Sequence, residues 1–241
     1  MNQELGFEEG CGFDRDSRSQ PRLADIIEPV KKVGILLIVV TAFGAAFVLT
    51  PPKGRRSMRE FDPARLTELE LGMWKAYYAK ERVRLFSLLV TLLHEQYHYS
   101  WATATREGFH LARAAATFGD LKGNYDVVLP DLEAAYAVAR AWTGSDFDPR
   151  AVAKAELAWW VQRRVPGQNS AEQIGGLIAD EYALLYETTR ARVAEAALLR
   201  AEAAALRDAE AARPDWDRVG RLLLQSYTEL RSALSSETVR R

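Results

Sequence analysis

Four glutamates interrupt apolar helical stripes in this 241-residue chain, and together they could hold a cation. Each has apolar residues at helical spacing before and after it, so a helix would place its carboxylate on a face that packs against the core. An isolated buried carboxylate is costly, and it must be protonated, paired or bound to a cation. The four residues are Glu70, Glu95, Glu156 and Glu181.

The glutamates recur because two parts of the chain are similar. Residues 61–74 read FDPARLTELELGMW, and residues 147–160, 86 positions later, read FDPRAVAKAELAWW. A later block, residues 125–136, matches residues 216–227 at an offset of 91. Ordered matches of this kind predict a tandem duplication.

Each repeat has the pattern of three helices. An Asp-Pro pair begins the first helix, with Asp62 or Asp148 as the N-cap and proline at the first helical position. Long middle helices are expected over about 84–118 and 171–211, and a third helix follows each of them. No run of alternating β-branched residues predicts a strand. The sequence therefore predicts an all-α, six-helix domain built from a duplicated three-helix unit.

Helical hairpins would bring the four glutamates to one level. Within each repeat the two glutamates are 25 residues apart, and they lie equally far from an expected turn, near residues 82–83 in the first repeat and 167–170 in the second. If the two hairpins pack face to face, four carboxylates converge at one depth.

A histidine adds a metal-binding pattern to the first hairpin. His98 follows Glu95 by three positions, and dimetal bundles combine single glutamates on two helices with Glu-x-x-His on the others. Residues 61–190 therefore resemble, at motif level, the ferritin-like superfamily of carboxylate-bridged dimetal proteins, although Leu184 stands where the second histidine would be. The resemblance implies an oxidoreductase or metal-binding protein with two Fe or Mn ions. The implied ligands are Glu70, Glu95, His98, Glu156 and Glu181.

Residues 94–98 also spell His-Glu-x-x-His, the zinc-protease signature, in which two histidines share one helical face. Under this second alternative His94 and His98 bind Zn, and a later acidic residue such as Glu156 completes the site of a zinc hydrolase.

The same glutamates have an interpretation without a metal, and it is the one we favour. A repeated glutamate can be a repeated ion pair with arginine, and tandem helical units commonly form interaction surfaces. The formal net charge is −1 and no basic face is clustered, so nucleic acid is not an expected partner. We therefore expect a non-catalytic interaction or scaffold domain that binds another protein or a second copy of itself.

Two further features are expected to be structural. Trp74 and the pair Trp159 and Trp160 have helical spacing, which is typical of a core more often than of a ligand pocket. Residues 191–212 read ARVAEAALLRAEAAALRDAEAA, and this composition predicts a strong helix that is solvated or packed and carries no site.

An uncharged apolar stretch near the N-terminus predicts a membrane-spanning helix. Eighteen helical residues span about 27 Å, close to the thickness of the hydrocarbon core. The long polar segment before this stretch disfavours a cleaved signal peptide, and the basic residues after it favour a cytoplasmic main domain. If translation begins at Met58 instead, a soluble cytoplasmic protein is expected. The expected organisation is a polar, disordered segment over 1–32, a transmembrane helix over 33–50, a linker over 51–60, and helical repeats over 61–146 and 147–236 that pack as one domain.

Overall fold

A computed structural model describes residue 38 and residues 41–238 of the chain. The chain divides into two compact units, Met1–Ala45 and Ala46–Arg241, and the second unit carries all of the elements discussed below.

The predicted membrane segment lies largely outside this description. The polar segment 1–32, and residues 33–37 and 39–40 of the predicted span over 33–50, are outside the described residues. Residues 41–49 are helical. Within the described part of the chain, no helix has the length and apolar character needed to cross a membrane.

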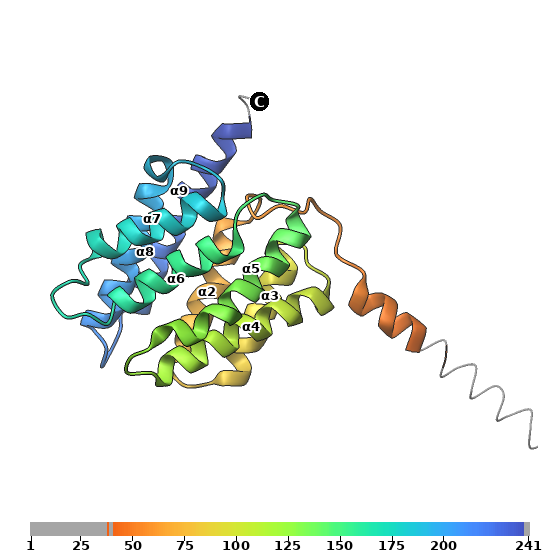
Figure 1. Ribbon diagram of the computed structural model, residues 1–241, viewed down its shortest axis with the longest axis horizontal. Helices are drawn as coiled ribbons and strands as arrows, with labels where there is room; N and C mark the ends of the chain where they lie inside the picture. The colour runs from red at the N-terminus through yellow and green to blue at the C-terminus, as the bar shows by residue number, and fades with distance from the viewer. Residues whose placement is uncertain (1–37, 39–40, 239–241) are drawn as a thin grey trace, which may run out of the picture. The chain divides into compact units, whose positions relative to one another are not determined.

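The second unit is built from helices, which confirms the all-α prediction (Figure 1). From residue 50 onward its described residues form eight α-helices and one short 3-10 helix, and no strand. The elements are α2 (Pro63–Tyr78), α3 (Arg82–Gln96), α4 (Trp101–Asp120), η1 (Tyr125–Val128), α5 (Leu129–Thr143), α6 (Pro149–Gln162), α7 (Ala171–Leu185), α8 (Arg190–Ala209) and α9 (Trp216–Thr238).

The prediction of six helices is wrong, because each of the two long middle helices is broken once. The predicted helix over 84–118 is α3 and α4, and the one over 171–211 is α7 and α8. Each break contains a residue in the left-handed conformation, His98 with φ 55° and Glu187 with φ 47°, which ends an α-helix. The Ser100 side chain then caps α4 by accepting a backbone N–H bond.

The predicted helix starts are confirmed at both Asp-Pro pairs. The Asp62 side chain accepts hydrogen bonds from the backbone N–H groups of Ala64 and Arg65, and that of Asp148 accepts one from Arg150. These caps fix where α2 and α6 begin. They thereby fix the helical position of the glutamate that each helix carries.

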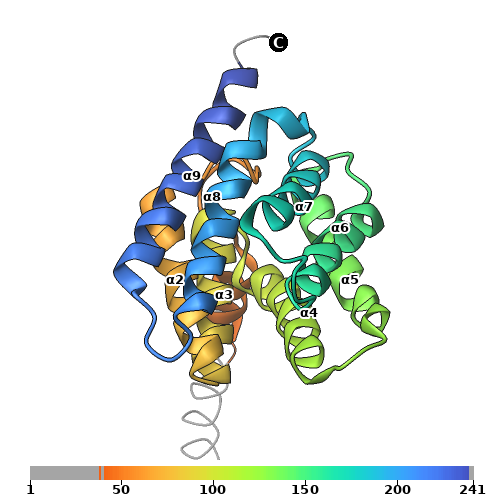
Figure 2. The same ribbon diagram turned by 90° about the vertical axis from the view of Figure 1, so that its left-hand side faces the viewer.

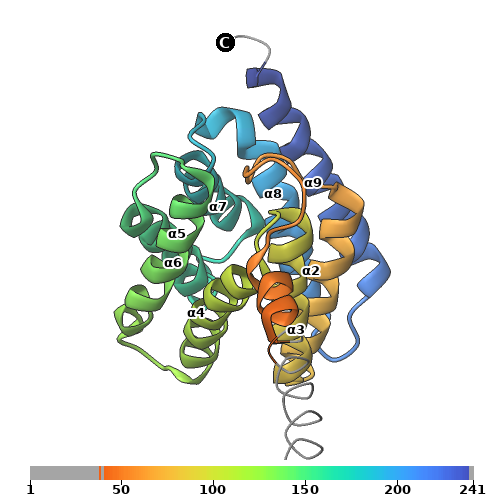
Figure 3. The same ribbon diagram turned by 90° about the vertical axis from the view of Figure 1, so that its right-hand side faces the viewer.

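The eight α-helices form a closed ring. Each packs against the next in sequence, and α9 returns to pack against α2. In the described part of the chain, α-helices that are not neighbours in this order make no close backbone contact. Figures 2 and 3 show α2, α3, α8 and α9 on one side of the ring and α4 to α7 on the other. Side chains therefore fill the interior between helices that face one another across the ring.

Close packing between α7 and α8 sets the position of the residues that these helices direct inward. A Cβ atom at Gly175 would lie 2.9 Å from the Cα atom of Leu198, so only glycine allows α8 to approach α7 this closely. This contact brings Glu181 on α7 near Arg200 on α8.

Candidate functional site

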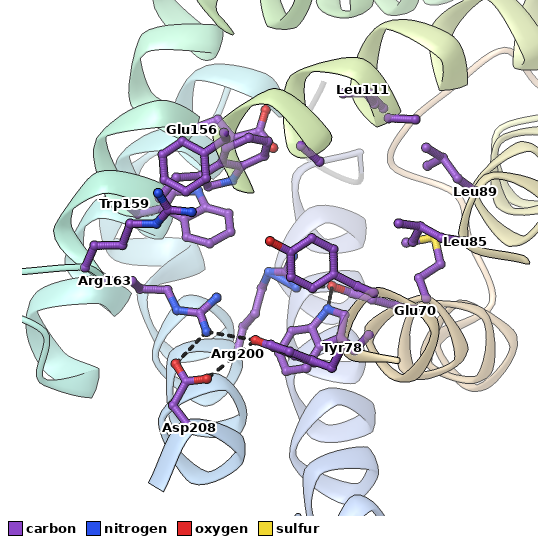
Figure 4. A pocket seen from close by; sticks show the side chains of 18 residues that line it. Glu70, Tyr78, Leu85, Leu89, Leu111, Glu156, Trp159, Arg163, Arg200 and Asp208 are labelled. Carbon is purple, nitrogen blue, oxygen red and sulfur yellow. Dashed lines mark hydrogen bonds and ion pairs between the residues drawn. The ribbon is translucent and has the colours of Figure 1, made fainter. Parts of the chain in front are cut away.

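Three of the four predicted glutamates lie in the interior of the ring, and an arginine lies among them. We call Glu70 on α2, Glu156 on α6, Glu181 on α7 and Arg200 on α8 the carboxylate cluster. Arg200 forms an ion pair with Glu70, and Trp74 Nε1 donates a hydrogen bond of 3.1 Å to Glu70 Oε1 (Figure 4). Because α2 and α8 are not neighbours in the ring, this ion pair crosses the interior.

The other two carboxylates share a tyrosine. The Tyr136 hydroxyl donates to Glu156 Oε2 at 2.9 Å and lies 3.4 Å from Glu181 Oε1. Trp159 Nε1 donates to Glu181 Oε2 at 2.5 Å. Because a hydroxyl carries one proton, Tyr136 satisfies both glutamates only when one of them is itself protonated. The hydrogen bonds therefore favour a proton held between Glu156 and Glu181.

Burial also favours a protonated carboxyl group at Glu156 or Glu181. Desolvation raises the pKa of both Glu156 and Glu181, and the negative charge of Glu181 raises the pKa of Glu156 further. The hydrogen bonds from Tyr136 and Trp159 and the positive charge of Arg200 oppose this rise without cancelling it. The cluster thus holds three carboxyl groups against one guanidinium, and it retains a proton well above the pH at which an exposed glutamate ionises.

A further buried acid lies on α4 and was missed by the sequence interpretation. Glu107 is 4% exposed, and its Oε2 atom has no hydrogen-bond partner among the described residues. Burial raises the pKa of Glu107 to about 8, and the adjacent Tyr99 hydroxyl partly offsets the rise. The only sequence signal that Glu107 would be buried is a weak one: apolar residues lie on the same helical face, at Ala104 and Leu111.

A cavity of about 410 Å³ opens beside the carboxylate cluster, within the size range of small-molecule sites (Figure 4). We call it the aromatic cavity, because six aromatic residues line it together with aliphatic and charged side chains. Its lining residues are Glu70, Met73, Trp74, Tyr77, Tyr78, Leu85, Leu89, Leu111, Ala112, Ala115, Phe118, Glu156, Trp159, Trp160, Arg163, Arg164, Arg200 and Asp208.

The cavity bears on two expectations from the sequence. The three tryptophans pack against the core, as expected, and they also line the cavity. Arg200 belongs to the alanine-rich stretch 191–212, for which no site was expected, yet it supplies the positive charge of the cluster. Its partner is 130 positions away in the sequence, and no local pattern indicates such a pairing.

The two remaining arginines of the cavity already have partners. Arg163 Nη2 donates to Asp208 Oδ2 at 2.6 Å and lies 3.4 Å from the Tyr78 hydroxyl. Arg164 lies over the Phe118 ring, 3.7 Å from its centroid, and donates to a backbone carbonyl. Arg163 and Asp208 also line a second cavity of about 300 Å³, so their ion pair stands between the two cavities.

The fourth predicted glutamate is not in the interior. Glu95 lies at the surface, where Arg65 Nε donates to its Oε2 at 2.8 Å. Glu95 is three residues before the left-handed His98, whereas Glu181 is six residues before the left-handed Glu187. Counted from these helix ends, the position that matches Glu181 is Leu92. The sequence match at an offset of 86 therefore does not hold here, because the connection before α7 is longer than the one before α3.

The two histidines of the His-Glu-x-x-His string do not share a helical face. Helix α3 ends at Gln96, so His94 lies within it and His98 lies beyond it. His94 Nδ1 is 2.7 Å from the carbonyl oxygen of Tyr99, and its ring stacks on Trp101 at 3.8 Å between centroids. The two histidines therefore lack the shared helical face that a helical zinc motif needs.

The residues of the carboxylate cluster do not fit a dimetal centre. Arg200 occupies the place among the carboxylates that a metal cation would need, and Glu95 and His98 lie elsewhere. In residue 38 and residues 41–238, no group of three or more His, Cys, Asp or Glu side chains is arranged to hold a metal ion.

Comparison with known proteins adds no assignment. No family model, no curated protein and no solved structure matches the chain.

Proposed function

We propose that the domain is a non-catalytic module that binds a small organic molecule in the aromatic cavity. One observation carries the proposal: the cavity of about 410 Å³ is walled by aromatic and aliphatic side chains and reaches the buried carboxylate of Glu70. Apolar walls with a few placed polar groups are typical of sites that bind small ligands.

Binding is favoured over catalysis by the residues that the cavity presents. Among its described lining residues none is serine, threonine, cysteine, histidine or lysine, and each carboxylate that could act as an acid, base or nucleophile is bonded to Arg200, Tyr136 or Arg163. Four of the charged groups there form the ion pairs Glu70–Arg200 and Arg163–Asp208, which hold them in place for the orientation of a ligand.

A fluorescent probe and a matched pair of variants test the proposal. N-phenyl-1-naphthylamine is uncharged at neutral pH and fluoresces strongly in apolar sites. Ala115 lines the cavity, while the next residue, Ala116, is exposed and does not. We expect Ala115→Trp to weaken dye binding at least tenfold and Ala116→Trp to leave it unchanged. Equal dye binding by both variants, each folded by circular dichroism, would overturn the proposal.

The arrangement of the helices also supports a proposal about origin: a tandem duplication of a four-helix unit. Helices α2, α3 and α4 have 16, 15 and 20 residues, and α6, α7 and α8 have 14, 15 and 20. The second helix of each set ends two residues before a residue with positive φ.

The membrane tether over 33–50 stays a prediction, and so does the cytoplasmic placement of the main domain. Its test is the distribution of the full chain between membrane and soluble fractions, beside a chain that starts at Met58. We expect alkaline carbonate to leave the full chain in the membrane fraction and to release the shorter one.

A further inference from the structure

We infer that the ligand of the aromatic cavity is an organic cation, a protonated amine on an aromatic or branched apolar body, whose positive group is received by Glu70 and Glu156. The inference rests on the proposed binding function and adds the chemical class of the ligand. Three independent features of the site lead to it.

The first feature is an unused acceptor in the wall of the cavity. Glu70 is 4% exposed, and only one of its carboxylate oxygens, Oε1, is bonded, to Arg200 and Trp74. The other oxygen, Oε2, has no hydrogen-bond partner among the described residues. A buried carboxylate oxygen without a donor is unfavourable. A ligand ammonium in the cavity would supply the missing donor and an opposite charge.

The second feature is the charge balance. The carboxylate cluster has three carboxyl groups and one guanidinium, and Glu70 and Glu156 both line the cavity. Arg163 pairs with Asp208, and Arg164 is held by a carbonyl oxygen and an aromatic ring. The lining as a whole has three acidic and three arginine side chains, but the arginines all have partners that an anion would have to displace, whereas Glu70 Oε2 has none. A cation suits the site better.

The third feature is the direction of the aromatic rings. The guanidinium carbon of Arg200 lies 5.8 Å from the ring centroids of both Trp74 and Trp159, within the range of cation–π attraction. Both tryptophans line the cavity, and their indole N–H groups are turned to carboxylates. Rings placed in this way favour positive charge near the cluster, and the aliphatic side chains of the opposite wall suit an apolar body.

Three ligands with one body and different head groups test the inference. The probes are 4-phenylbutylamine, 4-phenylbutanol and 4-phenylbutyrate, titrated calorimetrically into the full chain at pH 7. We expect the amine to bind at least tenfold more tightly than the alcohol and the carboxylate to bind most weakly. We expect Glu70→Gln to remove the preference for the amine while binding of the alcohol persists.

A second measurement tests the inference on the wild-type chain if the Glu70→Gln variant does not fold. The amine is titrated into the wild-type chain in two buffers that differ in ionisation enthalpy, which reports protons released on binding. The arriving cation should displace the proton held by Glu156 and Glu181, so the apparent enthalpy should depend on the buffer for the amine and not for the alcohol. The same apparent enthalpy for the amine in both buffers would count against the inference.

The outcomes separate the ligand class from the binding function. Equal affinities of the amine and the alcohol, or a preference for the carboxylate, would overturn the cation inference and leave the binding proposal in place. If none of the three ligands binds while N-phenyl-1-naphthylamine binds in the cavity, the cation inference is likewise overturned and the binding proposal is kept. If the dye does not bind either, both the inference and the binding proposal are overturned.

Discussion

Arg200 on α8 pairs with Glu70 on α2 across the interior of the helix ring, between two helices that have no close backbone contact. Both side chains are largely buried, so neither charge is well solvated if the other is removed. Burial raises the pKa of both Glu156 and Glu181, and the same guanidinium partly opposes that rise. One side chain therefore supplies the positive charge of the whole carboxylate cluster, and the stability of the fold should depend on it.

Loss of Arg200 should be strongly destabilising. We expect Arg200→Met to reduce the free energy of unfolding in urea by about 3–5 kcal/mol at pH 7, because it leaves buried carboxylates without a counter-charge. The double variant Arg200→Met with Glu70→Met should recover much of the loss, because it removes both members of the pair. A cost below about 1 kcal/mol for Arg200→Met would show that the pair is solvated.

The stability of the protein should fall as the pH rises from about 5 to 8. Burial raises the pKa of Glu156 and Glu181 above the value of 4.5 for an exposed glutamate, so the folded state binds more protons than the unfolded state over this range. Their contribution is fully present below the unfolded pKa and is lost as the pH rises through the folded pKa, with a slope of at most about 1.4 kcal/mol per pH unit for each carboxyl.

Glu156→Gln should flatten this pH dependence, measured as the difference in unfolding free energy between variant and wild type. Glu95→Gln is the matched control. Arg65 lowers the pKa of Glu95, which is therefore ionised in both folded and unfolded states above pH 5. If the two variants change the slope equally, the pKa of Glu156 is not raised.

Glu107→Gln should stabilise the protein in alkaline solution and have little effect near pH 5. Burial raises the pKa of Glu107 to about 8, so ionisation of this side chain opposes folding as the pH approaches and passes that value. The glutamine cannot ionise, and the gain should be at most about 5 kcal/mol at pH 9, the free energy that corresponds to this shift in pKa. Thermal unfolding of variant and wild type at pH 5 and pH 9 measures this difference in stability. An equal difference at the two pH values would contradict the raised pKa of Glu107.

Loss of the ion pair between Arg163 and Asp208 should affect the entry of ligands into the aromatic cavity more than the stability of the fold. Asp208 is 45% exposed, so we expect Asp208→Ala to cost less than about 1 kcal/mol. Because the pair stands between the two cavities, its loss should speed the association of N-phenyl-1-naphthylamine in stopped-flow fluorescence. An unchanged association rate would show that the dye enters by another route.

Two adjacent glycines on α7 should respond in opposite ways to alanine. At Gly175 the added Cβ would meet the backbone of Leu198 at 2.9 Å, so α8 must move, and we expect a loss of about 1–3 kcal/mol. At Gly176 it would meet only the end of the flexible Arg190 side chain, and the gain in helix propensity should leave stability unchanged or raise it by up to about 1 kcal/mol. Equal costs in urea unfolding would mean that α7 and α8 can separate freely.

The sequence by itself determined the helical class, the starts of α2 and α6, and the glutamates at 70, 156 and 181 as residues of interest. These features depend on neighbours within one or two helical turns, such as the Asp62 side chain and the N–H groups that follow it. The breaks at His98 and Glu187 were not recognised, because a single left-handed residue that is not glycine leaves a weak pattern.

Only the tertiary structure decided which charges meet. The sequence match placed Glu95 beside the other three glutamates, but a longer connection before α7 shifts the register, and Glu95 binds Arg65 at the surface. Arg200 joins the cluster from a stretch that looks solvated, because closure of the ring packs both α2 and α8 against α9 and lets their inward side chains meet. Local pattern fixes the face on which a side chain lies, whereas its partner depends on packing between helices more than a hundred residues apart in the chain.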